Sequence, residues 1–392
     1  MPQAFDVIVL GTGAMGASAT YQLAKRGVRV LGIDQYDPPH TLGSTHGETR
    51  ITRIACGEGE IYTRLARRSH EIWPEIERER AQGSEGSLMT SNGLIVIAGP
   101  AAAKRHGNAR FLENTADNAR KAGVAWESLN AEQIRSRYPA FRVNDDEKAY
   151  LDHVSGFLRP EACVTAQLSL ARKHGAVTHV NETVKDFEAV GGGVEVRTNK
   201  ATYAARRLII TAGAWLPHLL KSDNGSPFVI QRQVLYWFAP HSEEDLASFK
   251  QERFPVFIWL VPDRPLVIYG FPALGGMADG IKIAAEENES STTLSSVNRT
   301  VSDREKTEMY ETYIRPFFPG LSSGCVRAEV CLYTKVKDGR FIIDRHPSMD
   351  NVIIASPCSG HGFKHSPAIG ELLAQMALEQ SHIDISEFAL HQ

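Results

Sequence analysis

The stretch of sequence that decides the fold is FDVIVLGTGAMG, from Phe5 to Gly16. It places an apolar run, Val7 to Leu10, directly before a cluster of glycines. An amphipathic segment from Ala17 to Arg26 then leads to a second apolar run from Val28 to Ile33. This order of patterns predicts a β-α-β unit. Because the first run is apolar without alternation, we expect a central parallel strand that is covered by helices on both faces.

The glycines of this stretch have the G-x-G-x-x-G spacing of a dinucleotide-binding turn. In such a turn Gly11 permits the tight bend, Gly13 lets a pyrophosphate approach the backbone, and Gly16 allows the helix to pack closely on the strand. Asp34 ends the next apolar run, where an acidic side chain accepts a hydrogen bond from a ribose hydroxyl. The combination predicts dinucleotide binding but does not distinguish FAD from NAD. The alternative is a tight turn without a ligand.

The rest of the chain indicates a discontinuous nucleotide-binding domain. The apolar run Val352 to Ala355 leads through a glycine-containing loop to a helical pattern, which repeats the form of the N-terminus. We therefore predict an α/β fold with a Rossmann-like domain and a second, mainly antiparallel-sheet domain that binds the substrate. The first domain is predicted to comprise residues 1–85, 150–218 and 325–392, and the second residues 86–149 and 219–324. Helical spacing is clearest at residues 60–77, 161–174, 302–317 and 367–379.

Composition and charge exclude several classes of protein. A chain of 392 residues with 42% hydrophobic and 23% charged residues is typical of a globular protein. The net charge is -3 and the sequence has no dense basic block, so we expect no nucleic-acid partner. No apolar stretch approaches the roughly 18 residues of a membrane helix, and no signal sequence precedes the first strand. We expect no membrane association, a cytoplasmic location and a monomer. The 5 cysteines include no CxxC pair, so neither a disulfide framework nor a metal site is expected.

Three further clusters carry side chains that could do chemistry. The first, from Ser44 to Arg53, contains an imidazole and two guanidinium groups that could hold a flavin and an anion, or could be ordinary solvated side chains. The second contains Cys331 between apolar residues, which on its own is typical of an inert core thiol. The third, from Ser359 to Lys364, has glycines that would let the backbone approach a ligand, or would form a plain β-α turn.

Taken together, these clusters resemble the monomeric sarcosine oxidase and N-methyltryptophan oxidase family of FAD-dependent amine oxidases. The resemblance covers nearly the whole chain. It implies FAD as the cofactor and the oxidation of secondary amines, either N-methyl or cyclic amino acids, by O2. The products would be H2O2 and an imine that hydrolyses. Besides FDVIVLGTGAMG, the motifs that carry it are DPPHTLGSTHGETR (37–50), IYGFP (268–272), VCLYTK (330–335) and SGHGFKHSP (359–367).

The resemblance also implies roles for individual residues. Cys331 matches the cysteine that this family joins covalently to the flavin, and Lys282 matches the lysine placed where O2 reacts. Arg53 and Lys364 would hold the substrate carboxylate. The cofactor-binding residues would be Gly11, Gly13, Gly16, Asp34, Gly360, His361 and Gly362, with His46 and Arg50 against the flavin ring.

Two departures from the family pattern concern the substrate. Members that oxidise sarcosine carry a tyrosine just before the YGFP run, where this chain has Ile268, and a histidine four residues after the lysine, where it has Glu286. We therefore expect an altered pocket, so that a larger or cyclic secondary amino acid is as good a candidate for the substrate as sarcosine. Two alternatives remain open: a flavin amine dehydrogenase that passes electrons to a quinone or carrier, and a flavin-binding subunit without turnover.

Overall fold

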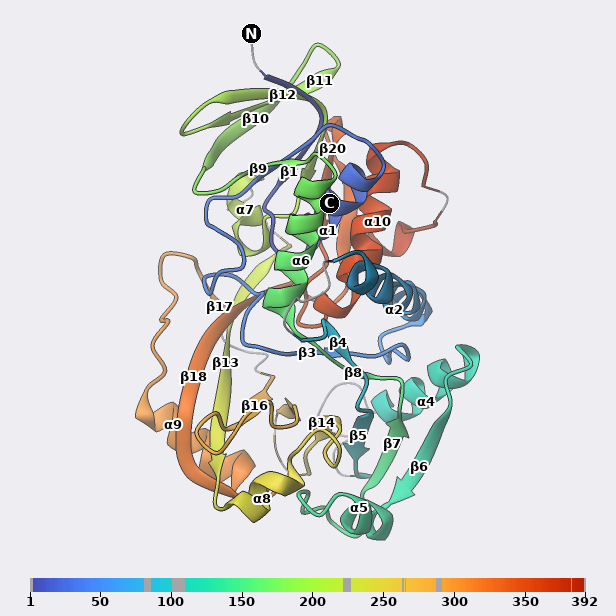
Figure 1. Cartoon of the computed structure of the whole chain (residues 1–392), viewed down its shortest axis with the longest axis vertical. Coiled ribbons are helices and arrows are strands. Elements are labelled where there is room, and N and C mark those ends of the chain that lie inside the picture. The colour runs from blue at the N-terminus through green and yellow to red at the C-terminus, as the bar shows by residue number, and fades with distance from the viewer. Residues whose placement is uncertain are drawn as a thin grey trace.

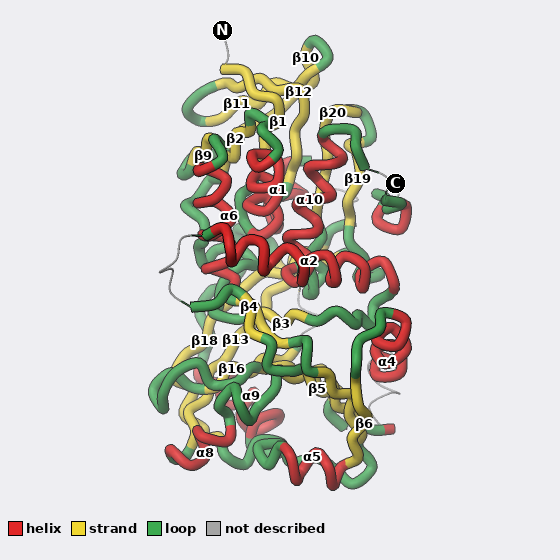
Figure 2. Tube along the Cα trace, turned by 45° about the vertical axis from the view of Figure 1, so that its right-hand side comes forward, coloured by secondary structure: helices red, strands yellow, loops and turns green. Residues whose placement is uncertain are grey.

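The computed structural model describes residues 3–80, 86–100, 110–220, 227–262, 264, 266–286, 291–381 and 383–390. Two large sheets lie one above the other along the longest axis of the molecule, and helix α2 (Glu60–Glu79) runs across the middle between them (Figures 1 and 2). The predicted α/β fold class, with one Rossmann-like and one mainly antiparallel sheet, is confirmed. The domain boundaries stay a prediction.

The upper sheet is built around the predicted β-α-β unit. Strands β1 and β2 are parallel, with Val7 opposite Val30, and helix α1 joins them. The eight strands include a parallel central part and antiparallel edges. In order they are β10 (Val184–Val190), β11 (Gly193–Thr198), β12 (Thr202–Ile210), β1 (Gln3–Leu10), β2 (Val30–Ile33) and β9 (Val177–His179), with β20 (Met349–Ser356) beside β12 and β19 (Ile342–His346) beside β20.

Both faces of β1 are buried, as its unbroken apolar run predicts. Val7 and Val9 pack in one cluster with helices α1 (Ala14–Lys25), α6 (Pro160–Lys173) and α10 (Ser366–Ala377). Ile8 and Leu10 face the other way. On this second face the short helix α7 (Leu216–Leu219) supplies only part of the apolar cover, and the antiparallel strand β11 supplies another part, so the expected cover by helices is only partly met there.

The lower sheet is mainly antiparallel and contains two long strands that the sequence patterns did not predict. These strands, β13 (Val229–Pro240) and β18 (Leu321–Lys335), pair along nearly their whole length. The other strands of this nine-stranded sheet are β17 (Ser291–Thr292), β16 (Ile281–Ala285), β15 (Val267–Gly270), β14 (Val256–Leu260), β5 (Leu94–Ala98), β7 (Lys148–Asp152) and β6 (Trp126–Asn130).

Smaller elements complete the chain. The helix expected at 302–317 is present as α9 (Asp303–Met309), and Ser302 and Glu305 form a capping box at its start. The helix then continues as a π-helical turn at Tyr310–Ile314. A three-stranded sheet of β3 (Arg50–Thr52), β8 (Gly156–Leu158) and β4 (Met89–Thr90) lies at the junction of the two halves. The remaining helices are α4 (Phe111–Lys121), α5 (Ala131–Arg137) and α8 (Glu243–Ser248).

The alternation of side chains in the lower sheet decides which residues face the middle of the molecule. Leu235, Trp237, Ala284, Cys331 and Tyr333 share one apolar cluster. Their immediate neighbours along the strands face the opposite core. Since successive strand residues point to opposite faces, one face of this sheet collects the residues of several sequence motifs.

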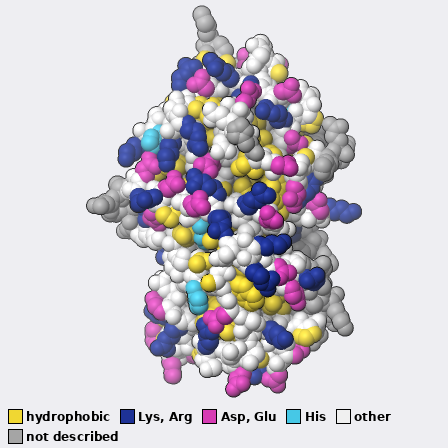
Figure 3. Space-filling view, turned by 90° about the vertical axis from the view of Figure 1, so that its right-hand side faces the viewer, with side chains coloured by type: hydrophobic (Ala, Val, Ile, Leu, Met, Phe, Trp, Pro, Cys, Tyr) yellow, Lys and Arg dark blue, Asp and Glu magenta, His cyan; other side chains and the backbone are white. Residues whose placement is uncertain are grey.

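Charged side chains are distributed over the surface without separation by sign on one face of the molecule. On the face shown in Figure 3, acidic and basic side chains are interspersed rather than gathered by sign. Within the described ranges, no helix is both long enough and apolar enough to cross a bilayer.

Candidate active site

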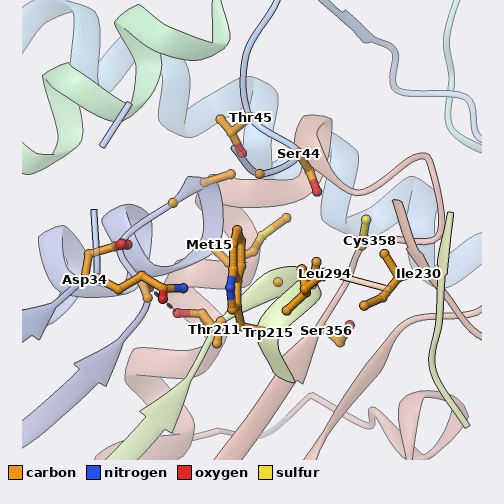
Figure 4. A pocket seen from close by; sticks show the side chains of 18 of the residues that line it. Met15, Asp34, Ser44, Thr45, Thr211, Trp215, Ile230, Leu294, Ser356 and Cys358 are labelled. Atoms are coloured by element: carbon orange, nitrogen blue, oxygen red, sulfur yellow. Dashed lines mark hydrogen bonds between the residues drawn. The ribbon is translucent and has the colours of Figure 1, made fainter. Parts of the chain in front are cut away.

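The first cavity lies at the carboxyl ends of the parallel strands of the upper sheet. It has a volume of about 880 Å³. Gly11, Asp34, Thr211 and Ser356, which end or follow β1, β2, β12 and β20, line it. Figure 4 shows Asp34, Thr211 and Met15 around this opening. Ligands of open parallel sheets bind at this edge, and we call this space the nucleotide cavity.

The three glycines of the motif have different surroundings, as dinucleotide binding requires. A Cβ on Gly16 would lie 1.8 Å from the carbonyl oxygen of Gly11, and one on Gly11 would lie 2.8 Å from that of Thr211. A Cβ on Gly13, by contrast, would meet no protein atom within 4 Å, although Gly13 lines the nucleotide cavity. Only Gly13 is therefore free to be approached by a ligand at the amino end of α1, which fits a pyrophosphate.

Asp34 is held in place by backbone donors of both neighbouring turns. Its Oδ2 accepts a hydrogen bond from the Thr12 N–H at 2.7 Å, and its Oδ1 accepts one from the Tyr36 N–H at 3.0 Å. Burial raises the pKa of Asp34, and these two hydrogen bonds oppose that change. A carboxylate oxygen accepts more than one hydrogen bond, so each oxygen keeps capacity for a ribose hydroxyl.

A second cavity, which we call the inner cavity, continues from the nucleotide cavity. Its volume is about 1060 Å³. The two cavities share walls, and the inner one reaches the face of the lower sheet and the loop before α10. The residues that line both are Arg50, Tyr333, Gly360 and Phe363.

Three charged side chains meet in the inner cavity. Arg53 Nη2 donates to both Glu58 oxygens, at 2.7 and 2.9 Å, and Lys364 Nζ lies 3.9 Å from Glu58 Oε1. Burial by itself would raise the pKa of Glu58, but the two cations hold it well below its usual range. Burial lowers the pKa of Lys364, and Glu58 opposes that change. The structure thus brings Arg53 and Lys364 together, as the sequence predicted, and adds a carboxylate between them.

Glycine and histidine residues of the 359–367 motif form the wall beside these charges. Gly360 has φ +83°, and a Cβ there would lie 2.9 Å from the Tyr333 ring. A Cβ on Gly362 would lie 1.7 Å from the Pro357 carbonyl oxygen. The His361 Nε2 is 3.1 Å from the Gly339 carbonyl oxygen, and burial lowers the pKa of His361 to about 4.

Lys282 is buried, with 3% of its surface exposed, and is not an ordinary exposed strand lysine. Its Nζ donates to the Gly47 carbonyl at 2.6 Å, to the Thr49 carbonyl at 2.9 Å and to Thr49 Oγ1 at 3.1 Å. It also lies 4.7 Å from the centre of the Phe271 ring and 5.5 Å from that of Trp237. Burial, and next the charge of Arg50, lower the pKa of Lys282 well below its usual value.

His46 and Arg50 lie in the same loop region. His46 Nδ1 is 3.1 Å from Glu329 Oε2, while in the described part of the chain its buried Nε2 has no hydrogen-bond partner. The hydrogen bond with His46, together with Arg327, lowers the pKa of Glu329 to about 2. Arg50 Nη1 donates to the carbonyl of Thr49 and lines both cavities. His46 itself lines neither cavity, whereas Ser44, Thr45 and Arg50 of the same stretch line the nucleotide cavity.

Cys331 lies on the sheet face that Lys282 shares, in one apolar cluster with Tyr333 and Trp237, and it lines neither cavity. Only 1% of its surface is exposed. Burial raises the pKa of its thiol, and the nearby cations Arg50 and Lys282 oppose that change.

Of the two residues predicted to alter the pocket, Glu286 lines the inner cavity but Ile268 does not. Glu286 Oε1 is 3.3 Å from Lys335 Nζ. Ile268 is fully buried in the core on the opposite face of β15, because adjacent strand residues point to opposite sides. The neighbouring Tyr269 lines the cavity instead, with its hydroxyl 3.3 Å from that of Tyr333. The chain therefore retains a tyrosine here, which corrects the prediction from Ile268.

Sequence reasoning missed Glu58, Tyr269 and Tyr333. Both tyrosines lie inside the quoted motifs, and alternation along β15 and β18 could have placed them on the cavity face. Glu58 follows Arg53 in a loop, where no periodicity applies. One part of the cavity wall is apolar, with Phe111, Ile258, Leu260, Val267 and Phe271, whereas another part is charged, with Lys335, Lys337, Asp338, Arg340 and Glu387. Buried cations above an apolar wall can bind a small carboxylic acid that carries an apolar group.

The chain is similar to several known proteins over nearly its whole length. The family model described as FAD dependent oxidoreductase (DAO) matches residues 6–376. The chain is 37% identical over 379 residues to the monomeric sarcosine oxidase of Streptomyces avermitilis, which covers 96% of this chain and 94% of that protein. It is 35% identical to the N-methyl-L-tryptophan oxidase of Yersinia pestis (strain Pestoides F), over 98% of each chain. The same fold is found in the solved structure of NikD, an unusual amino acid oxidase essential for nikkomycin biosynthesis. The two structures superpose with a TM-score of 0.82 at 22% sequence identity, over 99% of this chain and 97% of that one.

Proposed function

The chain belongs to the family of FAD-dependent oxidoreductases, and from this premise we propose that it oxidises the CH–NH bond of secondary amino acids. The substrates are N-methyl or cyclic amino acids, the electron acceptor is O2, and the products are H2O2 and an imine that hydrolyses. The observation that carries the proposal is the continuity of the nucleotide cavity with an inner cavity that contains Arg53 and Lys364.

FAD, when bound, accepts the two electrons of the amine and passes them to O2. Its pyrophosphate would lie against Gly13 and the amino end of α1, and its ribose against Asp34. The flavin ring would lie against Arg50, which lines both cavities, and His46 would act from behind this wall, since it lines neither cavity. Cys331 would supply the covalent attachment. Its position on the same sheet face as Lys282 supports this role.

Arg53 and Lys364 would bind the carboxylate of the substrate. Both side chains are buried, so their charges are poorly screened by water. Glu58 compensates them in the absence of substrate, which explains how two buried cations are tolerated. A substrate carboxylate would compete with Glu58 for the same donors. A substrate therefore needs an anionic end to compete with Glu58 for these two cations.

Lys282 would serve the reaction of O2. A fixed positive charge beside the flavin stabilises the negative charge that develops when an electron passes to oxygen. Its burial supports the proposal, because an ammonium group in a region of low dielectric constant acts more strongly than one in water.

The cavity wall supports a substrate larger than sarcosine. The apolar side chains of Phe111, Leu260 and Phe271 offer surface to an apolar substituent. Glu286 and Lys335, which pair with each other, form a polar edge. We propose that N-methyl amino acids with apolar side chains, and cyclic amino acids, are oxidised faster than sarcosine itself.

The test is oxygen uptake together with peroxide release, measured over a panel of amines. The panel contains sarcosine, N-methyl amino acids of increasing side-chain size, proline, and each amine without its carboxylate. The proposal expects uptake that depends on the carboxylate and rises with apolar side-chain size. A dehydrogenase would reduce a quinone dye with the same amines and consume little O2, and a subunit without turnover would do neither.

A further inference from the structure

Lys282 is surrounded by acceptors that come from one short loop. A lysine ammonium has three N–H donors, and Gly47 and Thr49 supply three acceptors within 2.6 to 3.1 Å of Nζ. None of these acceptors carries a full charge. The loop that supplies them therefore fixes the position of the ammonium, but a second group is needed to fix the loop.

Glu161, in the first turn of α6, provides that group. Its Oε1 accepts hydrogen bonds from the Gly47 N–H at 2.6 Å and from the Glu48 N–H at 3.1 Å. The Glu48 N–H and the Gly47 carbonyl belong to one peptide unit. That peptide thus donates to a carboxylate with its N–H and accepts from Lys282 with its C=O. Hydrogen bonds to both ends of a peptide polarise it and strengthen one another.

The backbone of this loop needs such support. Gly47 has φ +91° and Glu48 has φ +69°, so both residues are in the left-handed region, which a glutamate rarely adopts without restraint. A Cβ on Gly47 would lie 2.5 Å from Leu235 Cδ1, so the loop also fits closely against the sheet. The side chain of Glu48 is held from the sheet side, where it accepts from Trp237 Nε1 at 3.0 Å.

We propose that Glu161 is a positioning residue that turns the carbonyl of the 47–48 peptide toward Lys282 and thereby keeps the ammonium charged and in place for the reaction of O2. This inference rests on the proposed role of Lys282 in that reaction. It adds a residue that lines neither the nucleotide cavity nor the inner cavity, although Val164 of the same helix lines the nucleotide cavity.

Four titratable groups affect the charge of Lys282. Burial and the guanidinium of Arg50 lower the pKa of Lys282, whereas Cys331, Glu161 and Glu48 raise it. Of the carboxylates in this set, Glu161 also holds the backbone that contacts the ammonium. Loss of its charge should therefore lower the pKa of Lys282, and the charged form should be lost at a lower pH.

The experiment compares Glu161→Gln with the parent and with Glu147→Gln. Glutamine keeps an oxygen that can accept both N–H groups but removes the charge. Glu147 is the matched control, because its carboxylate likewise accepts from a backbone N–H, that of Asn144 at 2.7 Å, and from Trp259 Nε1 at 2.6 Å. The titration of Lys282 is followed by 15N NMR of lysine-labelled protein, with Lys282→Met to assign the signal. Stopped-flow absorbance separates reduction by amine from reoxidation by O2.

We expect Glu161→Gln to lower the pKa of Lys282 by about one pH unit, and to slow reoxidation about tenfold at a pH above the new value. Reduction by amine should be nearly unchanged, and Glu147→Gln should behave like the parent in both assays. Glu161→Asp, which keeps the charge, should recover part of the reoxidation rate. In the Lys282→Met background, Glu161→Gln should cause no further loss.

Two results would overturn the proposal. One is a pKa of Lys282 that does not change in Glu161→Gln. The other is a double variant, Glu161→Gln with Lys282→Met, whose reoxidation is slower than that of Lys282→Met by the same factor that Glu161→Gln causes in the parent. If Lys282→Met itself reoxidised at the parent rate, the oxygen role in the proposed function would fail. The NMR titration would still decide whether Glu161 acts on the ammonium.

Discussion

Replacing Lys364 with methionine should separate substrates with a carboxylate from those without one. Lys364 is 4% exposed, and within the described structure its Nζ donates to the His361 carbonyl at 2.8 Å and lies near Glu58. An ammonium has three donors, so capacity remains for a substrate oxygen. Methionine has a similar length and keeps the apolar packing. Arg53 still pairs with Glu58 in the variant, so Glu58 retains a buried counter-charge.

The expected loss follows from the charge of this contact. A hydrogen bond to a charged group contributes about 1.5 to 3 kcal/mol, which corresponds to a roughly 10- to 150-fold loss in kcat/KM. Because Lys364 is buried, solvent screening should not reduce this figure much. The loss should apply to N-methyl amino acids and not to the same amines without their carboxylate.

The assay is steady-state oxygen uptake with matched pairs of amines, with and without the carboxylate. Lys306→Met is the control, because Lys306 is on the surface helix α9 and pairs only with Asp303 among the described residues, at 2.9 Å. Such exposed pairs contribute little, so the control should behave like the parent. An equal loss for both members of each pair would show that Lys364 supports the structure rather than the carboxylate. Unchanged kcat/KM would remove Lys364 from the site.

Four further outcomes are expected. Flavin should stay with the polypeptide after acid denaturation of the parent, and Cys331→Ser should release it. Cys358→Ser is the control and should behave like the parent. Free FAD from the denatured parent would contradict covalent attachment. Lys282→Met should keep its amine half-reaction and reoxidise about 10²- to 10³-fold more slowly. Burial lowers the pKa of Lys282 below 10.5, the usual value for a lysine. Reoxidation of the parent should therefore slow as the pH rises through this lowered pKa. A reoxidation rate that does not change with pH in stopped-flow assays would contradict the proposed role of Lys282. Gly13→Ala should fold and lose FAD affinity, whereas Gly16→Ala should lower the Tm of the apoprotein. The reason is that a Cβ on Gly16 would meet the backbone and a Cβ on Gly13 would not. If calorimetry and flavin titration showed the same behaviour for both variants, the roles given to these two glycines would be wrong.

The sequence predicted the upper sheet well because its signals are local. The apolar run, the three glycines and Asp34 follow one another within one β-α-β unit, and each has a steric or hydrogen-bonding reason visible in the sequence. The long strands β13 and β18 were missed because their partners are far apart in the chain, as in the pairing of Leu235 with Glu329. Their stability comes from this pairing rather than from local preference.

The candidate site shows the same limit. Family motifs named Arg53, Lys364 and Lys282, and the structure places all three at buried positions. The prediction for Ile268 was wrong by one position along β15. Adjacent residues of this strand point to opposite faces, so Tyr269 faces the cavity and Ile268 faces the core. Glu58 pairs with Arg53 inside an irregular loop, and Glu161 contacts the 47–48 peptide from a helix far along the chain, so no periodic spacing in the sequence could have indicated them.

The most direct test of the central claim is an anaerobic titration of the flavin-loaded protein with an N-methyl amino acid, followed by admission of O2. The visible absorption of the flavin should bleach with one equivalent of amine, and O2 should restore it with release of one equivalent of H2O2. A spectrum that stays oxidised with every secondary amino acid tested would contradict amine oxidation. Bleaching that O2 does not reverse would contradict the proposal that the enzyme is an oxidase.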